Sequence, residues 1–161
     1  MSHPHADLVT RFYQAFTERD AGAMAACYHP KVHFQDPAFD LEGARAGAMW
    51  HMLCARGTDL SLTVSDVHAD DLEGSAHWEA DYTFSQTKRH VHNEIDAAFT
   101  FEDGLIRTHR DTFDFWTWSR QALGAPGLFL GWTSWLRSQV SAKATASLDA
   151  YVERHPKTLS L

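Results

Sequence analysis

Two aspartates stand in sequence contexts where a carboxylate can act as a general base. Asp36 ends a short alternating segment and precedes Pro37, and Asp111 follows His109 by two residues. A carboxylate at the mouth of an apolar cavity loses solvation, which raises its pKa and makes it a better base near neutral pH. Asp36 is open to a second interpretation as a turn-forming residue, because Asp-Pro pairs initiate turns in any fold.

His109 and Asp111 would share one face of an extended strand. Residues two apart in a strand lie ~7 Å from each other, close enough to share a water or a substrate hydroxyl and move one proton. The alternative is a buried polar network in which the two side chains satisfy each other and hold the sheet. Both interpretations need the register that turns Phe113 and Phe115 inward, because the other register would place the pair on the surface.

Aromatic and amide side chains on neighbouring elements could complete a cavity around this pair. They would supply an amide, a phenol donor and aromatic walls for a planar ligand. The predicted substrate-binding residues are Tyr13, Trp50, Trp78, Tyr82, Asn93 and Phe113.

The sequence gives no signal for a metal or cofactor. His90 and His92 fall on the strand face opposite Asn93, and no HExxH spacing occurs. A glycine-rich phosphate loop, a GxSxG elbow and a Cys-His nucleophile signature are also absent from the sequence. Cys27 and Cys54 form no CxxC pair, so we expect two reduced, buried thiols and chemistry without a cofactor or metal.

Composition limits the number of domains and the classes of partner that the chain can have. The 161 residues suit one domain, and 44% are apolar, enough to bury a core. The net charge of −7 argues against a nucleic-acid partner. The longest apolar stretch, residues 128–136, is far shorter than the ~20 residues that span a bilayer, and its basic flank is weak, so no membrane partner is expected. The first seven residues lack a signal-peptide pattern, which favours a cytoplasmic location.

Helical periodicity opens the chain and returns at its end. Apolar spacing predicts a helix over residues 8–16, a second from 21 to Tyr28 that Asp20 caps and Pro30 stops, and a third over 44–56. Residues 125–127 break the chain, and a C-terminal helix with a narrow apolar stripe starts near Ser134. The stripe comprises Trp135 or Leu136, Val140, Ala144, Leu148 and Val152.

From residue 59 the hydrophobic period changes from 3.6 to 2. Alternation predicts strands over residues 60–64, 76–84 and 91–101. After the Asp103-Gly104 hairpin turn, a fourth runs from Leu105 to about Trp116, and a short strand over 32–36 precedes them all. The fold class that fits is α+β, with a curved antiparallel sheet forming a cone around a pocket and the N-terminal helices packed on its concave face.

This order of elements resembles the SnoaL-like and ketosteroid isomerase-like members of the nuclear transport factor 2-like superfamily, over about residues 6–124. The specific pieces are LVTRFY at 8–13, HFQDP at 33–37 and EDGLIRTHRDTFD at 102–114. The resemblance implies a cone domain over 1–124, which residues 125–161 extend as helices covering the pocket or a dimer interface. It also implies a homodimer, to which Phe115, Trp116 and Trp118 could contribute.

The resemblance implies roles for both aspartates. Asp36 stands where ketosteroid isomerases carry their base, and Asp111 where SnoaL-like cyclases and limonene epoxide hydrolase-like members carry theirs. The isomerase also needs acidic donors for the enolate oxygen. Phe12 and Ala97 stand at those two positions, with Tyr13 one residue from the first. The resemblance therefore argues against Δ5-3-ketosteroid isomerisation.

Two function classes follow. The first is a cofactor-independent isomerase, cyclase or hydratase/hydrolase acting on a small apolar, polycyclic or ketonic molecule, with Asp36 or Asp111 as base and His109 assisting. The second is a non-catalytic module of the same fold that holds a hydrophobic ligand or a partner.

Overall fold

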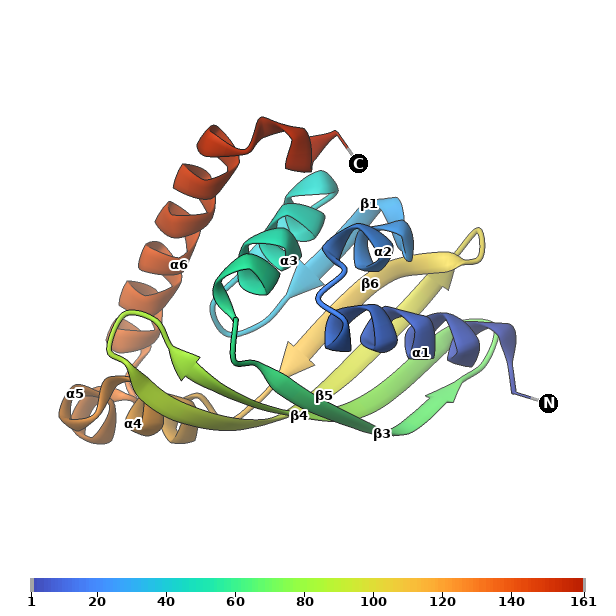
Figure 1. The fold of residues 1–161 in the computed structure, drawn as a ribbon. Helices are drawn as coiled ribbons and strands as arrows, with labels where there is room; N and C mark the ends of the chain where they lie inside the picture. Colours follow the sequence, from blue (N-terminus) through green and yellow to red (C-terminus); the bar gives the residue numbers. More distant parts are fainter. Residues whose placement is uncertain (1, 161) are drawn as a thin grey trace.

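A curved six-stranded sheet lies beneath the first three helices (Figure 1). The computed structural model describes residues 2–160. The helices are α1 (Pro4–Thr17), α2 (Ala21–Ala26), α3 (Ala44–Arg56), α4 (Phe115–Leu123), α5 (Ala125–Leu130) and α6 (Ser134–Arg154), followed by a 3-10 turn at Pro156–Leu159. The strands are β1 (Tyr28–Gln35), β2 (Asp40–Glu42), β3 (Ser61–Ala69), β4 (Glu73–Phe84), β5 (Arg89–Glu102) and β6 (Leu105–Thr112). The predicted α+β class is confirmed.

The sheet is mixed rather than purely antiparallel. Its strand order is β2-β1-β6-β5-β4-β3, and the pair β1 and β6 runs parallel with Phe34 opposite His109. The other neighbouring pairs are antiparallel. The expectation of an antiparallel sheet is therefore wrong for one pair, because β1 and β6 are far apart in the sequence and local alternation carries no information on their relative direction.

β6 turns His109 and Asp111 toward the interior, as the inward register predicts. His109 is 1% exposed and Asp111 is 4% exposed, while Arg110 and Thr112 beside them face solvent. The strand ends at Thr112 and not near residue 116. It ends early because the side chain of Asp114 caps α4, accepting a hydrogen bond from the N–H of Thr117 at 3.1 Å.

Tyr28 belongs to β1 and not to the helix before it. The sequence pattern predicts a helix through Tyr28 that Pro30 stops, but α2 ends two residues earlier. Pro30 is tolerated because it is exposed and because the pairing of β1 with β6 is irregular between Tyr28 and His33. β1 ends at Gln35, so Asp36 lies immediately beyond the strand.

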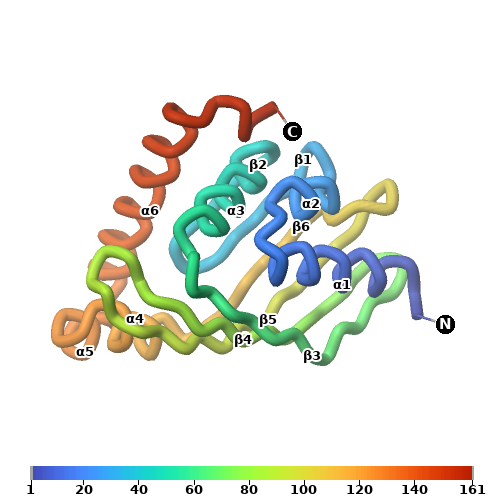
Figure 2. Tube along the Cα trace, in the orientation of Figure 1, coloured from blue at the N-terminus to red at the C-terminus, as the bar shows by residue number. Residues whose placement is uncertain are grey.

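The C-terminal segment forms two helices that return to the body of the molecule. α5 occupies the stretch where the sequence predicts a break, because Gly124 ends α4 with a φ of 72° and a proline is accepted in the first turn of the next helix. α6 begins at Ser134, as predicted, and runs beside α3 (Figure 2). Leu148 of its apolar stripe is fully buried in the same core as the cone. The domain boundary at residue 124 stays a prediction.

Large apolar side chains around α5 are exposed, namely Trp116, Leu128, Phe129, Leu130, Trp132 and Trp135. Of the three aromatics considered for a dimer contact, Phe115 and Trp118 are buried in a second apolar cluster of the chain itself, so Trp116 alone of the three reaches the surface. The homodimer stays a prediction. Within residues 2–160, no helix combines the length and apolarity needed to cross a membrane.

Candidate active site

A cavity of about 430 Å³ lies between the sheet, α3 and α6. This volume falls in the usual range of small-molecule sites, and the walls are mostly apolar with a few polar groups, as such sites require. The sheet contributes Trp78, Ala80, Tyr82, Asn93, Ile95 and Asp111, while α3 contributes Met49, Trp50 and Leu53.

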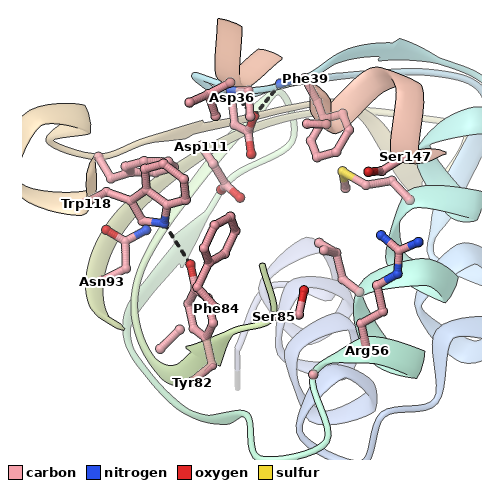
Figure 3. Close-up of a pocket in the computed structure, with 18 of the residues that line it drawn as sticks. Asp36, Phe39, Arg56, Tyr82, Phe84, Ser85, Asn93, Asp111, Trp118 and Ser147 are labelled. Carbon is pink, nitrogen blue, oxygen red and sulfur yellow. Dashed lines mark hydrogen bonds between the residues drawn. The ribbon is translucent and has the colours of Figure 1, made fainter. Parts of the chain in front are cut away.

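Asp36 both forms a turn and faces the cavity. Its Oδ1 accepts hydrogen bonds from the backbone N–H groups of Ala38 and Phe39, each at 2.7 Å. Its carboxylate also lines the cavity beside that of Asp111 (Figure 3). Burial and, second, the charge of Asp111 raise the pKa of Asp36 from 3.8 to about 7, against the opposing effect of the two backbone hydrogen bonds. The two interpretations of Asp36 are therefore compatible.

His109 and Asp111 contact each other directly. The distance between His109 Nε2 and Asp111 Oδ1 is 2.9 Å, and both side chains are buried. Asp111 lines the cavity, whereas His109 lies behind it, packed against the rings of Phe34 and Phe99. The prediction that His109 shares a substrate hydroxyl with Asp111 is therefore wrong in its geometry, and His109 can influence a ligand only through Asp111.

A chain of hydrogen bonds runs from Trp50 through Tyr28 and His109 to Asp111. The indole Nε1–H of Trp50 donates to the Tyr28 hydroxyl at 2.8 Å, which leaves the Tyr28 O–H free for His109 Nδ1 at 2.8 Å. Burial raises the pKa of Tyr28 well above 10, so its hydroxyl keeps its proton. With Nδ1 as acceptor, we assign the tautomer in which Nε2–H donates to Asp111. The chain holds Asp111 as an acceptor.

Five of the six predicted substrate-binding residues line the cavity: Trp50, Trp78, Tyr82, Asn93 and Phe113. Tyr13 does not. It packs against Trp78 with ring centroids 5.8 Å apart, and its buried hydroxyl has no hydrogen-bond partner within residues 2–160. Burial and then the charge of Asp111 raise its pKa well above 10. The placement of Tyr13 in the cavity wall is therefore a wrong prediction, because its position on α1 directs it into the core.

Tyr82 and Asn93 offer polar groups to a ligand. Trp118 Nε1–H donates to the Tyr82 hydroxyl at 2.8 Å, so the Tyr82 O–H can still donate (Figure 3). Burial raises the pKa of Tyr82 to about 12, which keeps that proton in place near neutral pH. Asn93 is 8% exposed, and its amide lines the cavity. A ligand oxygen would satisfy both groups.

The sequence analysis missed several residues of the site. Tyr28 was missed because its segment reads as a helix stopped by proline. The sequence analysis left open whether the C-terminal helix covers the pocket or a dimer interface. In the structure, the apolar stripe of α6 supplies Leu136, Val140 and Ala144 to the cavity. Arg56 and Lys143, both exposed, also border the cavity, and no sequence signal marks them.

Known proteins share this architecture. A family model described as the SnoaL-like domain matches residues 9–109. No curated protein matches the sequence. An epoxide hydrolase of M. tuberculosis, described as LEH-like, superposes with a TM-score of 0.63 at 18% identity, covering 78% of this chain and 92% of that one. A candidate polyketide cyclase of Xanthomonas campestris pv. campestris gives 0.62 at 19% identity, over 73% and 96% of the two chains.

A third structure is an NTF2-like protein of unknown function from Burkholderia pseudomallei, with a TM-score of 0.64 at 17% identity over 75% of this chain and 98% of that one. At such identities, the likeness of these structures concerns the fold alone. The family match itself spans more than half of the chain, from α1 to the middle of β6. The protein therefore belongs to the SnoaL-like family, with the fold of the NTF2-like superfamily.

Proposed function

We propose that the protein is a cofactor-independent enzyme that moves a proton on a small, largely apolar molecule, with Asp36 and Asp111 as an acid-base pair. One observation carries the proposal. Two carboxylates from different segments line the same apolar cavity, and the environment of Asp36 raises its pKa to about 7. A group that titrates near the working pH is the most effective general acid or base.

The different surroundings of the two aspartates suit Asp111 to the role of base and Asp36 to the role of acid. Asp111 accepts the Nε2–H of His109, which fixes the carboxylate at the cavity wall in the position of a base. The pKa of Asp36 is raised by burial and, second, by the charge of Asp111. This favours the protonated carboxyl group, which suits an acid. Two neighbouring carboxylates that share one proton are an established way to obtain both functions in one site.

This pair fits three reaction types. The protonated Asp36 can give its proton to a carbonyl or epoxide oxygen, while Asp111 removes a proton from carbon or from an attacking water. Isomerisation, cyclisation and hydration or hydrolysis all use this division. The aromatic walls favour a polycyclic or ketonic substrate, and Tyr82 and Asn93 can hold one of its oxygens. The names of the epoxide hydrolase and candidate cyclase relatives support this choice.

A binding module with the same cavity is the second candidate. The observation in its favour is that Phe12 and Ala97, both buried and apolar, stand where the isomerase that the chain resembles carries the acidic donors for its enolate. In this case the cavity holds a hydrophobic ligand, and the carboxylates only fix the surrounding structure.

The two candidates are distinguished by a panel of ketones, epoxides and polyketide-like aromatics tested on the wild type and on Asp111→Asn. Binding is followed by the fluorescence of the tryptophans that line the cavity, and turnover by product analysis. We expect Asp111→Asn to bind a turned-over compound with unchanged affinity and to lose about 10²- to 10⁴-fold in rate. Asp36→Asn serves as the matched variant for the acid. Tight binding by the wild type with no turnover of any bound compound would favour the binding module.

A further inference from the structure

The outer face of the sheet carries a repeated His-x-Glu-x-Asp pattern that the proposed reaction does not use. It occurs at residues 77–81 of β4 and again at residues 92–96 of β5. The two strands pair antiparallel with Glu79 opposite Glu94, so the pattern meets itself in reverse order. Like charges placed directly across a strand pair destabilise a sheet unless something compensates them. A cation bound between Glu79 and Glu94 would therefore relieve their repulsion.

The central glutamates have histidines on either side whose rings are fixed by aspartates. His77 Nδ1 lies 2.9 Å from Asp96 Oδ1, and His92 Nδ1 lies 2.9 Å from Asp81 Oδ1. A carboxylate on one ring nitrogen fixes the orientation and tautomer of the ring and makes the other nitrogen a better ligand. Both rings thus present Nε2 to the centre of the cluster.

The ligand atoms already lie close together. The side chains of His77, Glu79 and Glu94 each offer one ligand atom, and these three atoms lie within 4.8 Å of one another. His77 Nε2 is 3.9 Å from one oxygen of Glu79, and His92 Nε2 is 3.2 Å from the other. Ligands at about 2.1 Å from a tetrahedral zinc ion are about 3.4 Å apart, so small side-chain rotations suffice to close the site.

We propose that the outer face binds one divalent transition-metal ion of the zinc type through His77, Glu79 and Glu94. His92 holds the second oxygen of Glu79, Asp96 orients His77, and water completes the coordination. One imidazole and two carboxylates suit Zn²⁺ or Co²⁺. The side chains of His77 and Glu79 are 29% and 36% exposed, so an ion can enter from solvent. The bound ion would connect β4 to β5 across the sheet.

The proposal is tested by titrating the untagged, EDTA-treated and dialysed full-length protein with ZnCl₂ in a calorimeter and with CoCl₂ in a spectrophotometer. A polyhistidine tag would itself bind the metal and must be absent. The titration is run at about pH 8, because protons compete with metals for imidazole nitrogen. We expect one ion per chain and visible absorption from protein-bound Co²⁺.

Matched variants locate the ion. His77→Gln and Glu94→Gln should each weaken Zn²⁺ binding by at least about tenfold, and Asp96→Asn, which removes an orienting group, by about tenfold. His90→Gln keeps the same face and strand but alters no proposed ligand, so it should bind as the wild type does. His29→Gln removes the histidine of a second group, with Glu102 and Asp103, and should also leave binding unchanged. Circular dichroism verifies that each variant is folded.

Two outcomes would overturn the proposal. One is the lack of saturable binding with one ion per chain. The other is binding that survives His77→Gln or disappears in His29→Gln.

Discussion

Beside the cavity, burial and the charge of Asp111 raise the pKa of Asp36 to about 7, whereas on the outer face a hydrogen bond from His92 lowers the pKa of Asp81 below 3.8. The residue type is the same, and the surroundings differ. Inside, an apolar wall removes water from a carboxylate that has a like charge beside it. Outside, solvent and a histidine both favour the charged form. The comparison teaches that burial moves the pKa of Asp36 to near neutral pH, whereas exposure and an ion pair keep Asp81 charged.

The histidines of the two faces differ in the same way. His109 is fully buried, and its two ring nitrogens contact Tyr28 and Asp111. His77 is partly exposed and contacts Asp96, which is itself 82% exposed. The inner contact is therefore expected to matter for stability and the outer one is not.

Replacing His109 should break the inner arrangement most strongly. His109→Leu fills most of the space of the imidazole with an apolar side chain but leaves the Asp111 charge buried without a partner. This is expected to cost about 3–5 kcal/mol of unfolding free energy. Urea denaturation measures it. The double variant His109→Leu/Asp111→Leu should recover part of the loss, because it removes the unpaired charge. A double variant less stable than His109→Leu would contradict this account.

The raised pKa of Asp36 predicts that the protein becomes less stable as the pH rises. Its pKa is about 7 in the folded protein and 3.8 ordinarily, so between these pH values the folded state holds a proton that the unfolded state has released. The stability that this group contributes is fully present below about pH 4 and is lost as the pH rises to about 7, by up to about 4 kcal/mol. Asp36→Asn removes the titration, so its stability relative to the wild type should rise across this range. Parallel pH profiles of urea unfolding for the two proteins would contradict the prediction.

Tyr28→Phe should have a smaller effect. The change leaves the Trp50 N–H and His109 Nδ1 without their partner inside the core, which costs about 1–3 kcal/mol in urea unfolding. Adding Trp50→Phe to Tyr28→Phe should cost less than Trp50→Phe alone, because the indole has already lost its acceptor. Strict additivity of the two changes would argue against a connected chain of hydrogen bonds.

His77→Gln should have the smallest effect. In metal-free protein its ion pairs are exposed, so we expect unfolding curves that cannot be separated from those of the wild type. A loss as large as that of His109→Leu would remove the distinction between the two faces.

Local patterns predicted the parts of this molecule that depend on neighbours in the sequence. Alternation along β5 placed Asn93 inward. In β6 two registers were open, and the choice that turns Phe113 inward also placed His109 and Asp111 inward. Helical spacing likewise predicted the apolar stripe of α6. These signals are short-ranged, and each concerns a single element.

What the sequence could not predict depends on contacts between distant segments. The parallel pairing of β1 with β6 brings Tyr28 to His109, and neither strand shows its partner in its own pattern. Tyr13 was misplaced because it lies about one helical turn before Phe16, the residue of α1 that lines the cavity, and packs against Trp78 in the core. The outer cluster is formed across two strands, so motif spacings within one helix could not detect it.

The most direct test of the acid-base pair needs no substrate. The carboxyl ¹³C resonance of Asp36, followed by NMR against pH in the wild type and in Asp111→Asn, reports its pKa. We predict a value near 7 in the wild type and a lower one, still above the ordinary value, in Asp111→Asn, because burial remains when the neighbouring charge is removed. A pKa near 4 in the wild type, or the same pKa in both proteins, would contradict the account.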